Sequence, residues 1–575
     1  MSFIKSAVLG TAVVVLAACS GDKTGSGVIG SAGDAAWAPE KLTSVKGVPI
    51  AEIEAALKKR LAGGPPGKVN DDQWSHTKRL YRRYNDNPLW LAADGLHEAR
   101  AMALSNSILQ AEQDGMRMDA YPIGTMAQSI AGIAQAQTAT AEQLADADVV
   151  LTAAFSALGE DYLTGQIDPK SVAQSWHIDV QEENVDSALA RGLRNTALDK
   201  AIATMRPSGE EYAALRKELD RFQRIVTNGG WPAVPGGESV KPGEQINPAR
   251  AAALRQRLSL EGLAPPPAAA PTATPASQSN RPAAATYDRG LASAVALFQA
   301  RHGIVVDSIL GGETLESLNR PAAYRAAQIA ANLERMRWLP RTLGSRYVVV
   351  NVSAFRLEAH DSAGKALEMK VIVGEDYEDK ATPVFSDSME TVVFRPYWNV
   401  TPDIAAKEIF PKGPGYLAAN DMETYREGGV LRIRQRPGEK NSLGLVKFLF
   451  PNDFNIYLHD TPNRELFDKD LRAFSQGCIR IEKPAEFAQW VLGWDAQRVE
   501  GMMNGSSDNQ SVRVPRKIPV YITYGTTYIR DGQLYFGNDL YDRDDKLVAE
   551  FLRGAFPAPE TVQAVQALRR IASKA

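Results

Sequence analysis

The chain has 575 residues, of which 44% are hydrophobic and 23% charged, with a formal net charge of -3. A near-neutral chain lacks the basic excess that attracts nucleic acid, so we expect no nucleic-acid partner. At about 100–200 residues per domain, this length predicts roughly three to five domains. The six histidines have no ligand-type spacing, and we therefore expect no metal site and no cofactor.

Residues 1–18 predict an export signal. Lys5 precedes an apolar stretch, Ala7–Ala18, that is short for a membrane span but matches a secretory h-region. The stretch ends in Leu16-Ala17-Ala18-Cys19, which resembles a bacterial lipobox; an ordinary signal peptide that ends near a cysteine is the alternative. The resemblance implies that Cys19 is lipidated and anchors the protein in the periplasm, with Ser20 pointing to the outer membrane of a Gram-negative bacterium.

Changes in composition divide the next part of the chain. Residues 19–45 are rich in Gly, Ser, Ala and Asp and predict a flexible tether. Residues 46–262 predict a helical scaffold domain, because apolar residues recur at three and four positions, as between Leu215 and Val226. Residues 263–286 are built mainly from Pro, Ala, Thr and Ser and predict an extended, semi-rigid linker.

Residues 287–320 predict a compact helical unit. Apolar residues from Leu291 to Phe298 fall on one helix face, Gly303 is placed to end that helix, and a second short helix follows. The pattern resembles the small peptidoglycan-binding domain of many cell-wall enzymes, although Ser308 stands where that family usually has glycine. The resemblance implies a glycan partner; a helical spacer that binds nothing is the alternative. We expect a connecting helix over 321–344.

A β-rich domain is predicted over 345–530. Alternating or β-branched runs predict strands at 347–352, 354–360, 367–373, 391–395, 446–450, 455–459 and 519–524. Asp361-Ser362-Ala363-Gly364 predicts a hairpin connection between the second and third of these strands. We expect helix and loop over 403–440, forming a cap over a cleft, and a C-terminal segment with a helix over 531–575.

The second of only two cysteines, Cys478, predicts the chemistry of this domain. It lies in Ser475-Gln476-Gly477-Cys478-Ile479-Arg480, nineteen positions after His459. The period of two along a strand places Tyr457 and His459 on the same face, so both side chains can reach one cleft. A thiol, a nearby imidazole and a glycine beside the thiol suit acyl transfer through a thioester.

The neighbouring residues predict how such a thiol would be assisted. We expect the imidazole and Arg480 to favour the thiolate, and Gly477 to let the backbone approach the scissile carbonyl. The N–H of Cys478, together with the Tyr457 hydroxyl, is expected to stabilise the oxyanion. A buried structural cysteine and a hydrogen-bonded structural histidine are the alternatives for each residue taken singly.

This pattern resembles the signature of the L,D-transpeptidase catalytic domain, a His followed by Ser-x-Gly-Cys-x-Arg. Other stretches resemble the large multidomain branch of that family: 382–385, 396–400, 434–438, 441–444 and 447–452 in the β domain, and 87–91, 94–96 and 229–232 in the helical region. Gln476 and Asp460 depart from the His and Gly that other members carry. In place of a carboxylate, a backbone carbonyl near position 460 is expected to orient His459.

The resemblance implies an α+β multidomain protein. A mostly antiparallel β catalytic domain with a helical or loop capping insertion would follow an all-α scaffold domain and a small α-helical peptidoglycan-binding domain. Cys478 and His459 would be catalytic, supported by Gly477, Tyr457, Ser475, Arg480 and Asp460. The candidate substrate-binding residues are Trp398, Asn399, Tyr397 and Arg436, with a place in the domain core as the alternative for Trp398.

The reaction implied by the resemblance takes peptidoglycan stem peptides as substrates. Cys478 would attack the carbonyl of meso-diaminopimelate in a tetrapeptide stem, expel D-alanine, and pass the acyl group to a second diaminopimelate in a 3→3 cross-link. Carbapenems would acylate the same thiol. The alternatives are an enzyme that attaches or detaches an outer-membrane protein at diaminopimelate, and a non-catalytic lipoprotein that binds the wall. The oligomeric state is left open.

Overall fold

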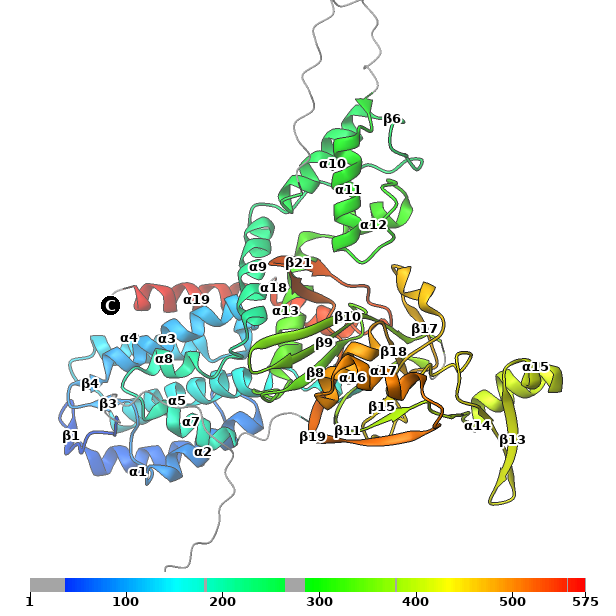
Figure 1. Ribbon diagram of the computed structural model, residues 1–575. Helices are drawn as coiled ribbons and strands as arrows, with labels where there is room; N and C mark the ends of the chain where they lie inside the picture. Colours follow the sequence, from blue (N-terminus) through cyan, green and yellow to red (C-terminus); the bar gives the residue numbers. More distant parts are fainter. Residues whose placement is uncertain (1–36, 180–183, 264–284, 378–379, 556, 574–575) are drawn as a thin grey trace, which may run out of the picture.

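The computed structural model describes residues 37–179, 184–263, 285–377, 380–555 and 557–573 (Figure 1). Cys19, the signal and most of the predicted linker lie outside these ranges, so the lipid anchor stays a prediction. A helical region comes first, a β-rich domain follows it, and a small helical unit stands beside the two (Figure 1). In the described part of the chain, no helix combines the length and the apolar character needed to cross a membrane.

The helical region is built around one long helix, α5 (Ala141–Thr164), which is buried along most of its length. The helices that contact it include α1 (Ile50–Leu61), α2 (Asp71–Arg83), α3 (Glu98–Ala111), α4 (Ile123–Gln135) and α7 (Val185–Leu193). Of the next two helices, α8 (Leu198–Ala203) packs against α3 and α7, and α9 (Glu210–Thr227) packs against α13 (Ala322–Arg337). The buried Asp148 carboxylate accepts hydrogen bonds from the backbone N–H groups of Leu89 and Trp90 and from the Tyr81 hydroxyl. This carboxylate therefore holds the stretch 87–91 against the central helix.

The β-rich domain is a closed barrel-like sheet. Its strands are β8 (Tyr347–Asn351), β9 (Arg356–Asp361), β10 (Gly364–Gly374), β11 (Val384–Phe394), β15 (Val446–Leu449), β16 (Leu458–His459), β18 (Ile479–Ile481) and β19 (Gln510–Thr523). Neighbours run in the order β15-β16-β18-β10-β9-β8-β19-β11, and β11 pairs with β15 to close the ring. The β16–β18 and β8–β19 pairs are parallel, and the other pairs in the ring are antiparallel.

The predicted strands all find a counterpart in this ring, but three differ markedly in length. Two of these, β11 and β19, begin well before the predicted strands at 391–395 and 519–524. The 455–459 strand is reduced to Leu458–His459, because Asn455 takes a positive φ of 55° that interrupts extended backbone. The Asp361–Gly364 connection forms the predicted hairpin, with Asp361 paired to Gly364. Helical scaffold and barrel are joined by β5 (Trp176–His177), which pairs in parallel with β11.

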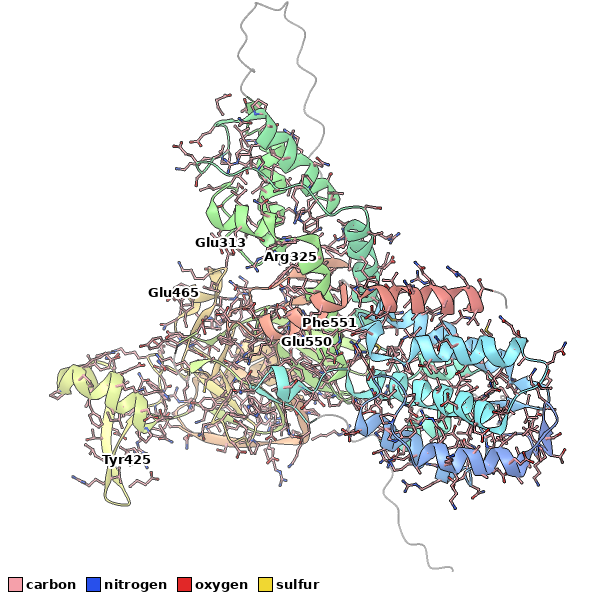
Figure 2. The ribbon with its side chains drawn as sticks, turned by 180° about the vertical axis from the view of Figure 1, so that it is seen from behind. Glu313, Arg325, Tyr425, Glu465, Glu550 and Phe551 are labelled. Atoms are coloured by element: carbon pink, nitrogen blue, oxygen red, sulfur yellow. The ribbon has the colours of Figure 1, made fainter. Side chains whose placement is uncertain are left out.

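The insertion over 403–440 differs from the expected helix and loop. It contains the helix α15 (Gly413–Ala419) but also a hairpin of β13 (Met422–Glu427) and β14 (Val430–Gln435). Gly428 and Gly429 both have positive φ and supply the two-residue turn that a tight hairpin requires. This hairpin projects away from the barrel, and Figure 2 shows Tyr425 on the projecting part.

The small helical unit draws on both sides of the predicted linker. The helix α10 (Pro248–Leu260) packs with α11 (Arg289–Arg301) and α12 (Gly312–Asn319) around one apolar core that includes Val234, Leu254, Tyr287 and Phe298. The predicted boundary at 262 therefore falls inside this core. Its wall-binding role stays a prediction.

The C-terminal segment folds back over the molecule as two helices. The helix α18 (Asp545–Ala555) packs against α13 (Ala322–Arg337), and α19 (Pro559–Ala572) packs against α3 and α4. Figure 2 shows Glu550 and Phe551 where α18 meets the helical region, and Glu550 pairs with Arg117 at 2.7 Å. The segment after the barrel is thus a structural link between barrel and scaffold.

Candidate active site

Strand register brings the predicted catalytic residues onto one face of the barrel. In the parallel pair β16–β18, Leu458 lies opposite Ile479 and His459 lies opposite Arg480. The Ile479 N–H donates to the Tyr457 carbonyl, which continues this register and places Cys478 beside Tyr457. Neighbouring strands lie about 4.8 Å apart and same-face residues about 6.6 Å apart along a strand, so the Cys478 and His459 Cα atoms are separated by roughly 8 Å.

Burial shows which way this face points. Leu458, Ile479 and Ile481 are fully buried in the barrel core, so the alternate side chains turn to the opposite face. There the Cys478 thiol is half-buried, and the Tyr457 and His459 rings lie with their centroids 5.7 Å apart. The predicted shared face of Tyr457 and His459 is therefore present, and Cys478 lies on it.

The tautomer of His459 follows from its neighbour. Its Nδ1 lies 2.6 Å from the backbone carbonyl oxygen of Asp460, which can only accept a hydrogen bond. Burial, with the charges of Arg480 and Lys447, lowers the pKa of His459 to about 3. The ring is therefore neutral at physiological pH, Nδ1 carries the hydrogen, and Nε2 is left as a base. A backbone carbonyl at position 460 thus orients this histidine.

The thiol is not held as a thiolate in the free protein. Burial raises the pKa of Cys478 above its ordinary value of 9.0, and this effect outweighs hydrogen bonds from Tyr457 and the charges of Lys447 and Arg480. Arg480 does favour the thiolate, as expected, but desolvation disfavours the charged form of the thiol more strongly, so the thiolate is not the stable form in this state. The pair consists of a neutral thiol beside a neutral base.

This pairing predicts the pH dependence of thiol alkylation. The thiolate is the reactive form, and its fraction rises about tenfold per pH unit below the pKa. We expect iodoacetamide to modify Cys478 at a rate that increases steadily from pH 6 to pH 9 without a plateau, with no inflection near the ordinary histidine pKa of 6.5. Intact-mass measurements at a series of pH values test this. A plateau below pH 7 would instead indicate a thiolate–imidazolium pair.

Ser475 and Gly477 shape the turn that carries the nucleophile. The Ser475 hydroxyl donates to the Cys478 carbonyl and accepts from the Gly477 N–H at 3.2 Å, so it closes the turn on both sides. Gly477 has a φ of +108°, a backbone conformation that side-chain-bearing residues rarely adopt. Both residues therefore act on the backbone conformation at Cys478.

Thr382, to which the sequence analysis assigns no role, orients the peptide unit that precedes Cys478. Its hydroxyl donates to the Gly477 carbonyl and accepts from the Gly374 N–H, each at 3.0 Å. The C=O and N–H of a trans peptide point in opposite directions, so the Cys478 N–H points away from the buried Thr382. Among the residues that the structure describes, this N–H has no backbone partner. It is free to serve as the predicted oxyanion donor.

The C-terminal segment braces the same turn from behind. The Tyr541 hydroxyl donates to the Gly374 carbonyl at 2.7 Å, and Arg543 donates to the Thr382 carbonyl at 3.0 Å. A Cβ at Gly374 would lie 1.9 Å from the Lys380 carbonyl oxygen, so only glycine allows this approach. No local motif in the sequence marks Tyr541 or Arg543 as part of the site.

Asp460 and Arg480 have separate roles. The Asp460 carboxylate accepts from the Leu445 N–H at 2.9 Å and packs against Gly444, where a Cβ would meet it at 2.3 Å. It therefore ties β15 to the strand end that carries His459, while its backbone carbonyl orients the ring. Arg480 donates to the Phe474 carbonyl at 2.9 Å and places a cation on the catalytic face.

Of the predicted substrate-binding residues, Arg436 lies in the insertion, and the other three lie just before it, in or next to β12 (Trp398–Asn399), which pairs with β14. Trp398 packs against the insertion's own apolar core, and Asn399 pairs with Arg434. The other contacts are Tyr397, whose ring lies 4.4 Å from the Arg434 guanidinium, and Arg436, which pairs with Glu423 at 2.7 Å. Their role toward a substrate stays a prediction.

One contact joins the insertion to the catalytic turn. Gln476 donates to the Glu408 carboxylate at 2.7 Å, from the π-helical turn Ala405–Ile409. Lys380 lies 3.5 Å from the same carboxylate. The insertion therefore borders the nucleophile through Glu408.

Two family models match parts of this chain, one in the helical region and one in the β-rich domain. Residues 75–219 match the family model of a scaffold domain, and residues 345–522 match that of an L,D-transpeptidase catalytic domain. A putative L,D-transpeptidase of Haemophilus influenzae is 30% identical over 243 residues, a match that covers 38% of this chain and 48% of that protein, about half its length. A crystal structure of an L,D-transpeptidase from Xylanimonas cellulosilytica is 16% identical, with 50% of this chain and 99% of that chain covered at a TM-score of 0.15.

Proposed function

We propose that this chain, which carries an L,D-transpeptidase catalytic domain over residues 345–522, is a peptidoglycan transpeptidase that forms 3→3 cross-links through Cys478. The donor is a tetrapeptide stem, the leaving group is its terminal D-alanine, and the acceptor is the side-chain amine of a second stem's diaminopimelate. The observation that supports this most is the neutral His459 base placed beside the Cys478 strand by register.

The acylation step follows from the tautomer of His459. Its Nε2 takes the thiol proton as the Cys478 sulfur attacks the diaminopimelate carbonyl, so the thiolate forms only when substrate is present. The carbonyl oxygen gains negative charge, which the Cys478 N–H stabilises. As the tetrahedral intermediate collapses, His459 returns the proton to the departing D-alanine nitrogen and a thioester remains.

Deacylation uses the same groups in reverse. The neutral His459 accepts a proton from the incoming amine as its nitrogen attacks the thioester carbonyl, and the thiol is regenerated with that proton. Because the histidine pKa is low, the imidazole is again a free base after each step. No other base is required on the catalytic face.

The test is a reaction with purified tetrapeptide stems. We expect mass spectrometry to detect a cross-linked dimer that lacks one D-alanine, together with an acyl-enzyme that lacks it as well. If the stems yield no dimer and a supplied outer-membrane protein becomes linked to diaminopimelate, the acceptor is a protein and the proposed cross-linking activity is wrong.

A further inference from the structure

A lysine on the catalytic face has no part in the mechanism above. Lys447 lies on β15 directly opposite His459, so three adjacent strands place Lys447, His459 and Arg480 in one row. Its ammonium lies 5.5 Å from the centre of the Tyr457 ring. The side chain is half-buried, and burial lowers its pKa.

The ammonium of Lys447 has no acidic partner among the described residues, and its electrostatic neighbour is the Cys478 sulfur, whose thiolate form it would favour. Several buried arginines of this chain are paired with carboxylates, as Arg257 is with Glu261, while Arg100 and Arg325 donate to carbonyl, amide or hydroxyl oxygens. A desolvated cation without a counter-ion is unfavourable for folding. Among the described residues, Lys447 has neither kind of partner, and its ammonium contacts the Tyr457 ring.

The surroundings of Lys447 favour an anionic ligand. Arg480 supplies a second cation on the same face, and both charges act on His459 to lower its pKa. Between these two cations the face presents the neutral thiol, the neutral imidazole and the Tyr457 hydroxyl. A carboxylate that enters here meets two positive charges on this row; the Glu375 carboxylate acts on Arg480, whereas Lys447 interacts with no carboxylate among the described residues.

We propose that Lys447 binds the C-terminal carboxylate of the donor stem. This inference rests on the proposed donor reaction, in which the scissile carbonyl carbon lies at the Cys478 sulfur. The terminal carboxylate of D-alanine is separated from that carbon only by the amide nitrogen and one Cα, so it lies close to the nucleophile. A charge-assisted hydrogen bond to the ammonium would select stems that end in a free carboxylate.

A carboxylate site at Lys447 would act on only one of the two half-reactions, the acylation of Cys478 by the donor. The carboxylate leaves with D-alanine once the thioester has formed, so Lys447 assists donor acylation and contributes nothing to attack by the acceptor amine. Its removal should therefore affect the donor KM and the acylation rate, and leave the resolution of a preformed thioester unchanged.

The experiment compares two donors on full-length variants. One donor is the tetrapeptide stem with a free C-terminal carboxylate, and the other is the same stem with a C-terminal carboxamide. Wild type should be acylated about 10- to 100-fold more efficiently by the carboxylate donor, as expected for a hydrogen bond to a charged group. Lys447→Met should lose this preference, and Lys447→Arg should retain most of it. Intact-mass analysis of single-turnover acylation gives both rates.

Controls separate the possible failures. Lys440→Met removes an exposed lysine and should leave the preference intact. If Lys447→Met slows both donors equally, Lys447 acts on the thiol or on the fold and the carboxylate site is wrong. If wild type acylates efficiently but does not distinguish the donors, the inference is also overturned while the proposed function stands. If wild type forms no acyl-enzyme with either donor, the proposed function fails and the inference fails with it.

Discussion

Replacing Cys478 with alanine or serine is expected to abolish acyl-enzyme formation and to reduce cross-linking by at least roughly 10⁴-fold. Alanine has no nucleophile, and a serine hydroxyl is far harder for a neutral imidazole to deprotonate than a thiol. The Cys478→Ser change alters one half-buried atom, so the melting temperature should change little. Mass spectrometry of enzyme and product, with a thermal melt of each variant, measures both effects.

His459→Gln provides the matched test of the base. Removing general-base catalysis should lower turnover by about 10²- to 10⁴-fold, with the Cys478 thiol still present for alkylation at high pH. The control is His360→Gln on β9. The His360 ring stacks on the Tyr347 ring, with 4.7 Å between the ring centroids, and is not on the strands that carry Cys478 and His459. Turnover close to wild type in His459→Gln would show that another group removes the thiol proton.

The sequence predicts that Cys478 and His459 lie together because its signals are local. The spacing of two residues between Tyr457 and His459 predicts that their side chains share a face of the strand. The short run from Ser475 to Arg480 shows which glycine precedes the thiol. The same local alternation predicts seven of the barrel strands at least in part, but not β18. The closure of the ring through β11 and β15 depends on pairing between distant segments, which one chain without an alignment does not specify.

The direction of the pKa shifts could not be predicted from sequence. Arg480 beside Cys478 suggested a stabilised thiolate, but the outcome depends on how much water the fold removes from both groups. The role of Asp460 was predictable only in part. Its backbone carbonyl orients His459, while its carboxylate accepts a hydrogen bond from the Leu445 N–H and packs against Gly444. Local residue identity does not distinguish these two uses.

The supporting residues missed by the sequence connect the site to the rest of the molecule. Tyr541 and Arg543 brace Thr382 and Gly374, and the next residue, Asp544, is paired with Arg335 of α13 at 2.6 Å. The stretch from Tyr541 to Asp544 thus links the long connecting helix to the turn that carries the thiol. The C-terminal segment therefore supports this turn, although it lies beyond the catalytic-domain match.

Thr382→Val tests whether this framework positions the nucleophile. The change keeps the side-chain shape but removes the hydroxyl, which leaves the buried Gly374 N–H and Gly477 carbonyl without their partner. At about 1–3 kcal/mol for each unsatisfied buried group, we expect the free energy of unfolding to fall by about 2–5 kcal/mol. Without the hydrogen bond to the Gly477 carbonyl, the peptide unit that includes the Cys478 N–H can rotate. We therefore expect kcat to fall roughly 10²-fold while the donor KM changes little.

Two further variants separate positioning from stability. Thr382→Ser retains the hydroxyl and should restore most of kcat, whereas Thr77→Val makes the same chemical change in the scaffold, where the hydroxyl donates to the Gln73 carbonyl at 2.9 Å. Thr77→Val should lower the melting temperature and leave kcat unchanged when both are measured below the unfolding transition. If Thr382→Val behaves in the same way, with kcat intact, the hydrogen bond to Gly477 only stabilises the fold. A kcat loss that serine reverses means that Thr382 aims the oxyanion donor.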